Sequence, residues 1–139
     1  LEQLFSEHAL IVVGTVVHAA PQEEKNYLSP SQVVYNVKSK REYLARLREV
    51  FKANRQIDVT FSDFHIMRHP TRPGIYGVSL RQRYRSDIYS DDGYLFLLWD
   101  FRDETSPKIH VRTWQPRMQA DHTPLPESEL FNISNFNLE

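Results

Sequence analysis

The sequence predicts an α+β domain in which one amphipathic helix packs against a meander of antiparallel strands. In the first half, apolar side chains recur at three- and four-residue spacing, which is typical of one buried stripe of a helix. These side chains are Tyr43, Leu44, Leu47, Val50 and Phe51. From Ile57 onward the apolar period changes to two, as in half-buried strands. The two patterns in this order indicate a helix layer on a sheet layer.

Ahead of the helix, the pattern predicts two strands. Residues 1–7 are typical of the last turns of a helix, and residues 9–17 are rich in β-branched side chains, as strands are. Residues 21–30 contain two prolines and predict an exposed connection, and residues 32–37 predict a short strand. We therefore expect the chain to enter the central helix from a strand.

The central helix is predicted over residues 40–54. Ser39 and Glu42 form an S-x-x-E capping box, in which each side chain satisfies a backbone N–H group at the start of the helix. Seven basic residues and two glutamates lie between residues 38 and 55. We interpret them as the solvated face of the helix. The alternative is a basic surface for RNA or an acidic partner, although no stacking motif accompanies it.

After the helix, the sequence predicts a meander. The segments with strand character are 57–69, 75–85, 94–102 and 108–114. Asp91-Asp92-Gly93 is a hairpin turn signal. The strand that follows this signal is apolar on both faces, which predicts a central strand covered on both sides.

The C-terminal segment, residues 117–139, is predicted to be an extension of a domain that covers residues 1–116. Three apolar side chains could pin it to the body as an added edge strand, and a disordered tail is the alternative. They are Phe131, Ile133 and Phe136. The chain ends on Leu138-Glu139, a dipeptide typical of a cloning remnant.

Composition excludes several classes of protein. The 139 residues are 40% hydrophobic, which is enough for one packed core. With 17 basic and 18 acidic residues the net charge is −1, so bulk electrostatics does not hold the chain to nucleic acid or anionic lipid. The absence of cysteine excludes disulfides, thiolate zinc sites and cysteine nucleophiles. No apolar run is long enough to span a membrane, and the sequence predicts no metal site and no cofactor.

The order of these elements resembles that of the nuclear transport factor 2-like superfamily, which has a cone-shaped, cystatin-like fold. FSEHALIV (5–12) is similar to the junction of the superfamily's second helix and first strand, and residues 39–51 are similar to its third helix. GYLFLLWDF (93–101) and IHVRTWQP (109–116) also resemble an uncharacterised bacterial branch of the superfamily.

This resemblance implies a strongly curved mixed or antiparallel sheet that, together with helices, encloses a ligand pocket. It also implies a homodimer formed through the sheet, and a secreted, periplasmic or cell-envelope location in a bacterium. Members usually begin with a long first helix, which is missing here or lies upstream of Leu1.

Polar residues on strands that face such a pocket are the candidate site residues. Asp100 lies in an otherwise apolar strand, where desolvation would raise its pKa and suit it to proton transfer. His110 and Arg112 share a face of the next strand, and with Asp100 they could form an acid/base or anion-binding group. The alternative for Asp100 is a position at a strand end, paired with Arg102, Arg112 or solvent. The alternative for the group as a whole is a structural hydrogen-bond cluster. The candidate ligand-binding residues are Tyr76, Trp99, Asp100, His110, Arg112 and Trp114.

Three functions follow from these observations. The favoured one is a non-catalytic module that binds a small apolar or anionic ligand or a protein partner, because no complete catalytic constellation is present. The second is an isomerase, cyclase or dehydratase that uses Asp100 and His110 in a pocket. The third is nucleic-acid binding through the basic helix, which the near-neutral charge disfavours.

Overall fold

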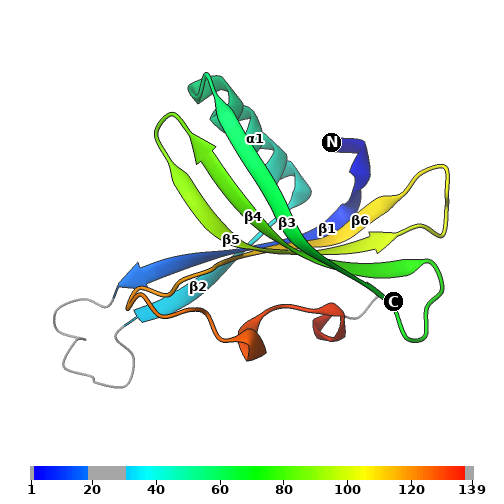
Figure 1. Ribbon diagram of the computed structural model, residues 1–139. Coiled ribbons are helices and arrows are strands. Elements are labelled where there is room, and N and C mark those ends of the chain that lie inside the picture. Colours follow the sequence, from blue (N-terminus) through cyan, green and yellow to red (C-terminus); the bar gives the residue numbers. More distant parts are fainter. Residues whose placement is uncertain (1, 19–30, 137–139) are drawn as a thin grey trace.

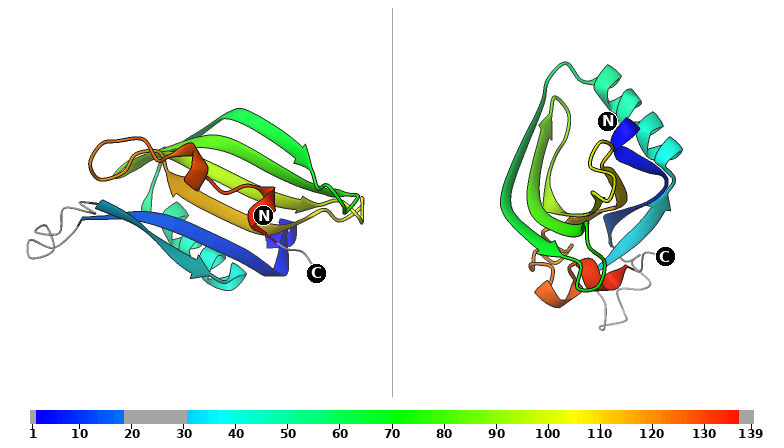
Figure 2. Two further views of the ribbon diagram at one scale, coloured as in Figure 1. Left: turned by 90° about the horizontal axis from the view of Figure 1, so that it is seen from below. Right: turned by 90° about the vertical axis from the view of Figure 1, so that its right-hand side faces the viewer.

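The computed structural model describes residues 2–18 and 31–136 of the chain and shows one curled, six-stranded mixed sheet (Figures 1 and 2). The strand order is β2-β1-β6-β5-β4-β3; β1 and β6 are parallel, and the other neighbours are antiparallel. The strands are β1 (Phe5–His18), β2 (Ser31–Lys38), β3 (Ile57–Arg68), β4 (Ile75–Ser86), β5 (Ser90–Asp100) and β6 (Lys108–Pro116). The sheet curls without closing into a barrel, which confirms the predicted α+β class.

One α-helix, α1 (Lys40–Ala53), packs against β1 and β2. It begins where the sequence predicts, because the Ser39 hydroxyl accepts from Glu42 N at 3.1 Å and the Glu42 carboxylate accepts from Ser39 N at 3.2 Å. Three short 3₁₀ turns complete the described elements: η1 (Glu2–Leu4), η2 (Glu127–Glu129) and η3 (Ile133–Asn135). No helix in the described part of the chain is long and apolar enough to cross a membrane.

The sheet has a helix face, toward α1, and a tail face, covered by residues 117–136. In Figure 1, α1 lies above the sheet and the C-terminal segment, in orange and red, lies below it. The core on the helix face contains Phe5, Ala9, Ile11 and Ile109, with Tyr43, Leu97 and Trp99 packed against them. The core on the tail face contains Ile75, Phe96, Leu98, Val111 and Ile133. Side chains of β5 therefore alternate between two cores, as predicted for a central strand.

The first residues differ from the prediction. The chain does not arrive through the end of a helix: η1 is a single 3₁₀ turn, and β1 already begins at Phe5. Phe5 pairs with Ile109 of β6 and is 3% exposed. Burial of this ring between β6 and α1 outweighs the local helical spacing of Leu1, Leu4 and Phe5.

The predicted hairpin turn at Asp91-Asp92-Gly93 is also wrong. The turn lies at residues 86–90, where Ser86 N donates to Tyr89 O at 2.7 Å, and Asp91 to Gly93 belong to β5. Asp91 lies opposite Tyr84, and Gly93 lies opposite Gln82. Glycine is required at this position by close packing and not by a turn, because a Cβ atom on it would lie 2.5 Å from the Trp114 ring.

Residues 117–136 pack on the tail face of the sheet and do not add an edge strand to it. Ile133 is 8% exposed within the tail-face core, and the rings of Phe131 and Phe136 pack against that core. Gln115 of β6 fixes this segment: its amide donates to Glu129 O at 2.8 Å and its carbonyl accepts from Phe131 N at 2.9 Å. The predicted cloning remnant, Leu138-Glu139, lies outside the described residues.

Candidate functional site

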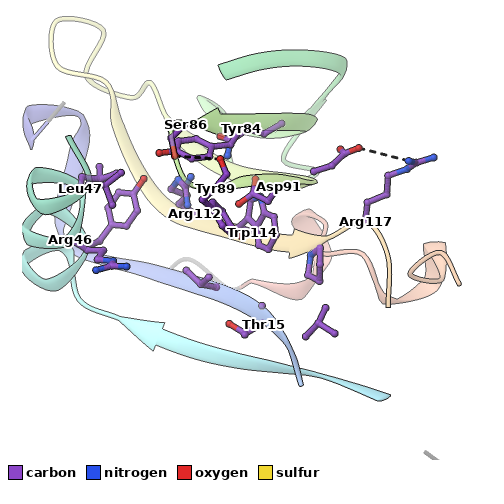
Figure 3. A pocket seen from close by; sticks show the side chains of 18 of the residues that line it. Thr15, Arg46, Leu47, Tyr84, Ser86, Tyr89, Asp91, Arg112, Trp114 and Arg117 are labelled. Carbon is purple, nitrogen blue, oxygen red and sulfur yellow. Dashed lines mark hydrogen bonds and ion pairs between the residues drawn. The ribbon is translucent and has the colours of Figure 1, made fainter. Parts of the chain in front are cut away.

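A pocket of about 850 Å³ opens between α1 and the sheet on the helix face (Figure 3). Its walls differ in chemistry. The α1 side is mainly apolar and includes Leu47, Val50 and Phe51, whereas the β4–β6 side carries most of the polar groups. The polar and aromatic residues of the sheet side are Gln82, Tyr84, Tyr89, Asp91, Arg112 and Trp114. The pocket thus presents an apolar wall opposite a polar floor, which suits a small amphipathic ligand.

Arg112 is the cation inside this pocket. It lies opposite Leu97 in the β6–β5 pairing, so its side chain emerges on the helix face. Its guanidinium carbon lies 4.8 Å from the centre of the Tyr43 ring of α1, which is a cation–π contact. Burial lowers the pKa of Arg112, with the Tyr43 and Asp91 side chains opposing that shift. Within the described residues, neither a hydrogen bond nor an ion pair satisfies the guanidinium.

Asp91 and Trp114 supply further unpaired polar atoms. Asp91 Oδ1 and Trp114 Nε1 are both buried, and each lacks a hydrogen-bond partner among the described residues. Burial raises the pKa of Asp91, and a side-chain hydrogen bond from Tyr89 opposes that shift. Burial, together with Asp91, raises the pKa of Tyr89 to about 12. Buried polar atoms in proteins are nearly always hydrogen-bonded, so unpaired ones beside a pocket are candidate ligand contacts.

The charges at the pocket rim are already paired. Arg46 lies 3.4 Å from Glu49. Arg117 lies 3.7 Å from Asp92, and a dashed line marks this pair in Figure 3. Asp92 also accepts two hydrogen bonds from Arg81, at 2.5 and 2.8 Å. Among the charged residues that line the pocket, Arg112 and Asp91 are therefore the ones without an ion-pair partner in the described structure.

The structure divides the residues predicted from the sequence into two groups. Arg112 and Trp114 line the pocket. Asp100 and His110 form an ion pair of 2.7 Å, but neither lines the pocket. Asp100 follows Leu98 by two residues and so lies on the tail face, whereas Leu97 and Trp99 face α1. Arg112 therefore does not join the Asp100–His110 pair.

A β-bulge explains why His110 and Arg112 do not share a face. Leu98 pairs with Val111 and Trp99 pairs with Ile109, which leaves His110 as an extra residue on β6. Its ring turns to the Asp100 carboxylate on the tail face, while Arg112 and Ile109 face α1. Strict alternation along the sequence cannot predict this change.

Tyr76 and Trp99 lie on the helix face but outside the pocket. They are directly opposed in the β4–β5 pairing. Both rings contact Phe101, with ring centres 5.8 Å apart for Tyr76 and 5.5 Å apart for Trp99. This aromatic group is at the opposite end of β4 and β5 from the hairpin at residues 86–90. Its Trp99 ring packs against the helix-face core, whereas Phe101 is exposed.

The expected rise of the Asp100 pKa is wrong. Arg102 holds the pKa of this carboxyl far below its usual range, because it donates from Nε at 3.0 Å and from Nη2 at 2.7 Å, and His110 contributes a further hydrogen bond. Asp100 is therefore ionised at neutral pH and is a structural anchor at the end of β5. Of the two earlier interpretations, the hydrogen-bond cluster at a strand end is the one that this geometry supports.

This ion pair predicts an acid-sensitive contribution to stability. Because the folded pKa of Asp100 is below its unfolded value, its contribution is complete above the unfolded pKa and is lost as the pH falls through the folded pKa. Asp100→Asn is expected to lower the free energy of unfolding at pH 7 and to have a smaller effect at pH 3. Urea unfolding at both pH values tests this; an equal loss at both would contradict it.

Sequence reasoning missed most of the pocket. Tyr84 lies on the face with Tyr76, Val78, Leu80 and Gln82 that the alternation identifies, so a signal existed. Asp91 was not predicted as a pocket residue because the sequence pattern placed it in a turn. Tyr43 and Leu47 were not predicted because they were expected to belong to the core. The described residues contain no cluster of three or more acidic or histidine side chains that could hold a metal ion.

A curled sheet with a helix over its concave side and a pocket between them defines a nuclear transport factor 2-like domain. A family model described as the Cds6 C-terminal NTF2-like domain matches residues 22–111, and the chain belongs to this family. None of the curated protein sequences matches the chain significantly. The family assignment confirms the superfamily that the sequence resembles.

Several solved structures share this fold. Bd1075 from Bdellovibrio bacteriovorus superposes with a TM-score of 0.57 at 16% identity, over 83% of this chain and 32% of that protein. The beta subunit of a putative aromatic-ring-hydroxylating dioxygenase from Novosphingobium aromaticivorans has a TM-score of 0.52 at 16% identity, over 89% of this chain and 81% of that one. A naphthalene 1,2-dioxygenase chain gives 0.51 at 12% identity, over 83% and 65%. This chain thus spans about a third of Bd1075, and the similarity establishes the fold alone.

Proposed function

We propose that this domain is a non-catalytic module that binds a small organic anion through the pocket on its helix face. The observation that carries this proposal is the Arg112 guanidinium, which is partly buried in the pocket and forms no ion pair in the described structure. A partly desolvated guanidinium that makes no ion pair can still gain charge-assisted hydrogen bonds from an anionic ligand group. Carboxylates match the planar guanidinium fork with two parallel hydrogen bonds.

The rest of the pocket indicates an apolar body on this anion. Leu47, Val50 and Phe51 form the wall that faces the polar floor, and Phe51 is 56% exposed. Trp114 offers an aromatic surface beside Arg112. Burying apolar area against these side chains contributes about 25 cal/mol per Å². An arylalkyl or alkyl monocarboxylate fits both walls.

The enzymatic alternative depends on an Asp/His pair in the pocket. Asp100 and His110 do form an ion pair, but it lies on the tail face and not in the pocket. Asp100 also forms an ion pair with Arg102. No observation in the described structure therefore favours an isomerase, cyclase or dehydratase activity.

Binding of simple carboxylates tests the proposal. We expect at least one of 3-phenylpropionate, indole-3-acetate and octanoate to bind, with the matched amide at least about tenfold weaker, because a hydrogen bond to a charged group contributes roughly 1.5–3 kcal/mol. Isothermal titration calorimetry gives both affinities, and thermal shift confirms them. Arg112→Gln should abolish the preference for the acid over the amide.

Arg46→Gln is the matched control. Arg46 also lines the pocket, but its head group is exposed and pairs with Glu49, so its replacement should change the affinity for the carboxylate by less than about threefold. The proposal is wrong if all three carboxylates fail to bind the wild-type domain. It is also wrong if Arg112→Gln folds and retains the wild-type preference for the acid.

A further inference from the structure

We infer that the ligand of this pocket is a zwitterion, an amino-carboxylate whose protonated amine meets Asp91 while its carboxylate meets Arg112. This inference rests on the proposed role of Arg112 and adds a second contact with a second residue. It narrows the ligand from organic monoanions to amino acids or amino-acid-like compounds with an apolar side group.

Asp91 is placed for this role by strand pairing. It lies opposite Tyr84 near the start of β5, and both side chains line the pocket. Positions 91, 95 and 97 of β5 alternate onto one face, and Leu97 of this set packs in the helix-face core and lies opposite Arg112. Figure 3 shows Asp91 and Arg112 on neighbouring strands beside the Trp114 and Tyr89 rings.

Arg112 and Asp91 influence each other but do not neutralise each other directly. Each affects the ionisation of the other through space, yet they form no direct ion pair. Asp91 Oδ1 has no hydrogen-bond partner in the described part of the chain. Asp91 does accept a side-chain hydrogen bond from Tyr89, so the capacity that it keeps for a ligand lies at Oδ1. The described part of the pocket thus offers one cationic and one anionic group, each with room for a further partner.

Charge balance then selects between ligand classes. The rim residues Arg46 and Arg117 already have acidic partners, so the inner pocket contains one charge of each sign that forms no ion pair within the described structure. A simple monocarboxylate would pair with Arg112 and place a second negative charge in the pocket beside the partly buried Asp91 carboxylate, which costs free energy or favours protonation of Asp91. An amino-carboxylate pairs with both groups and adds no net charge.

Matched probes test this inference. Phenylalanine, as the separate L and D enantiomers, is compared with 3-phenylpropionate and with phenethylamine, which lack the amine and the carboxylate respectively. By calorimetry at pH 7, we expect at least one enantiomer to bind about tenfold or more tightly than either single-charge probe. Asp91→Asn should remove most of the advantage over 3-phenylpropionate without weakening 3-phenylpropionate itself. Asp58→Asn, at an exposed position on β3, is the control.

The possible failures are distinguishable. If 3-phenylpropionate binds as well as phenylalanine to the wild-type domain, the zwitterion inference is overturned while the role of Arg112 stands. If phenylalanine keeps its full advantage in Asp91→Asn, the assignment of Asp91 is overturned. If neither phenylalanine nor any monocarboxylate binds, the proposed function itself fails. The wild-type comparison does not depend on the stability of any variant.

Discussion

Replacing Gly93 by alanine is expected to lower the free energy of unfolding by about 3 kcal/mol, because the new methyl group has no space. A Cβ atom at this position would collide with the Gln115 carbonyl oxygen and lie 2.5 Å from two ring atoms of Trp114. The carbonyl belongs to the neighbouring strand β6 and cannot move without breaking the sheet. The Trp114 ring would have to shift into the ligand pocket that it lines.

Urea unfolding followed by tryptophan fluorescence measures this loss, and Gly77→Ala is the graded control. At Gly77 the nearest atoms belong to the side chains of Phe96, at 3.0 Å, and Ile133, at 3.2 Å, which can yield by a few tenths of an ångström. The loss at Gly77 should be less than half that at Gly93. Equal losses, or an unchanged stability of Gly93→Ala, would show that Trp114 does not pack as described.

The second large effect is expected from Gln115→Leu. Gln115 is 2% exposed, and its amide group donates to Tyr35 Oη at 3.0 Å and to Glu129 O at 2.8 Å, while its carbonyl accepts from Phe131 N at 2.9 Å. Leucine removes these three partly buried hydrogen bonds at about 1 kcal/mol each, so the loss is on the order of 3 kcal/mol. The segment that follows β6 should then detach from the tail face.

Limited proteolysis and thermal unfolding report this change. Gln115→Leu should expose residues 117–136 to cleavage and lower the midpoint of thermal unfolding. Gln119→Leu is the control, because Gln119 hydrogen-bonds only within an exposed turn, to Thr123 and Pro124. A cleavage pattern in Gln115→Leu equal to that of the wild type would contradict the role given to this glutamine.

Periodicity and capping chemistry predicted most of the secondary structure. The box at Ser39 and Glu42 located the start of α1, and β-branched and alternating segments located all six strands. These signals succeed because they arise from local backbone chemistry and from one-sided burial. The start of β1 at Phe5 was missed because burial against β6 and α1 is not a local property.

The site was harder to predict than the fold for two physical reasons. Alternation separates the two faces of β5 but does not say which is concave, and Asp100 was assigned to the pocket although the pocket lies on the other face. The bulge at His110 shifts the alternation of β6 by one residue, so that side chains beyond it lie on the opposite face from the one that strict alternation predicts. The local sequence contains no signal for this bulge. Arg112 and Trp114 line the pocket because both lie beyond the bulge on the helix face, and their role in ligand binding stays a prediction.

The most direct test of the proposed function is a crystal structure of the domain with 3-phenylpropionate or, if it binds more tightly, phenylalanine. The account predicts a carboxylate held by the Arg112 guanidinium at about 2.8 Å, with the aromatic ring between Trp114 and the α1 wall. A ligand bound elsewhere, or one in this pocket whose carboxylate points away from Arg112 into solvent, would contradict it.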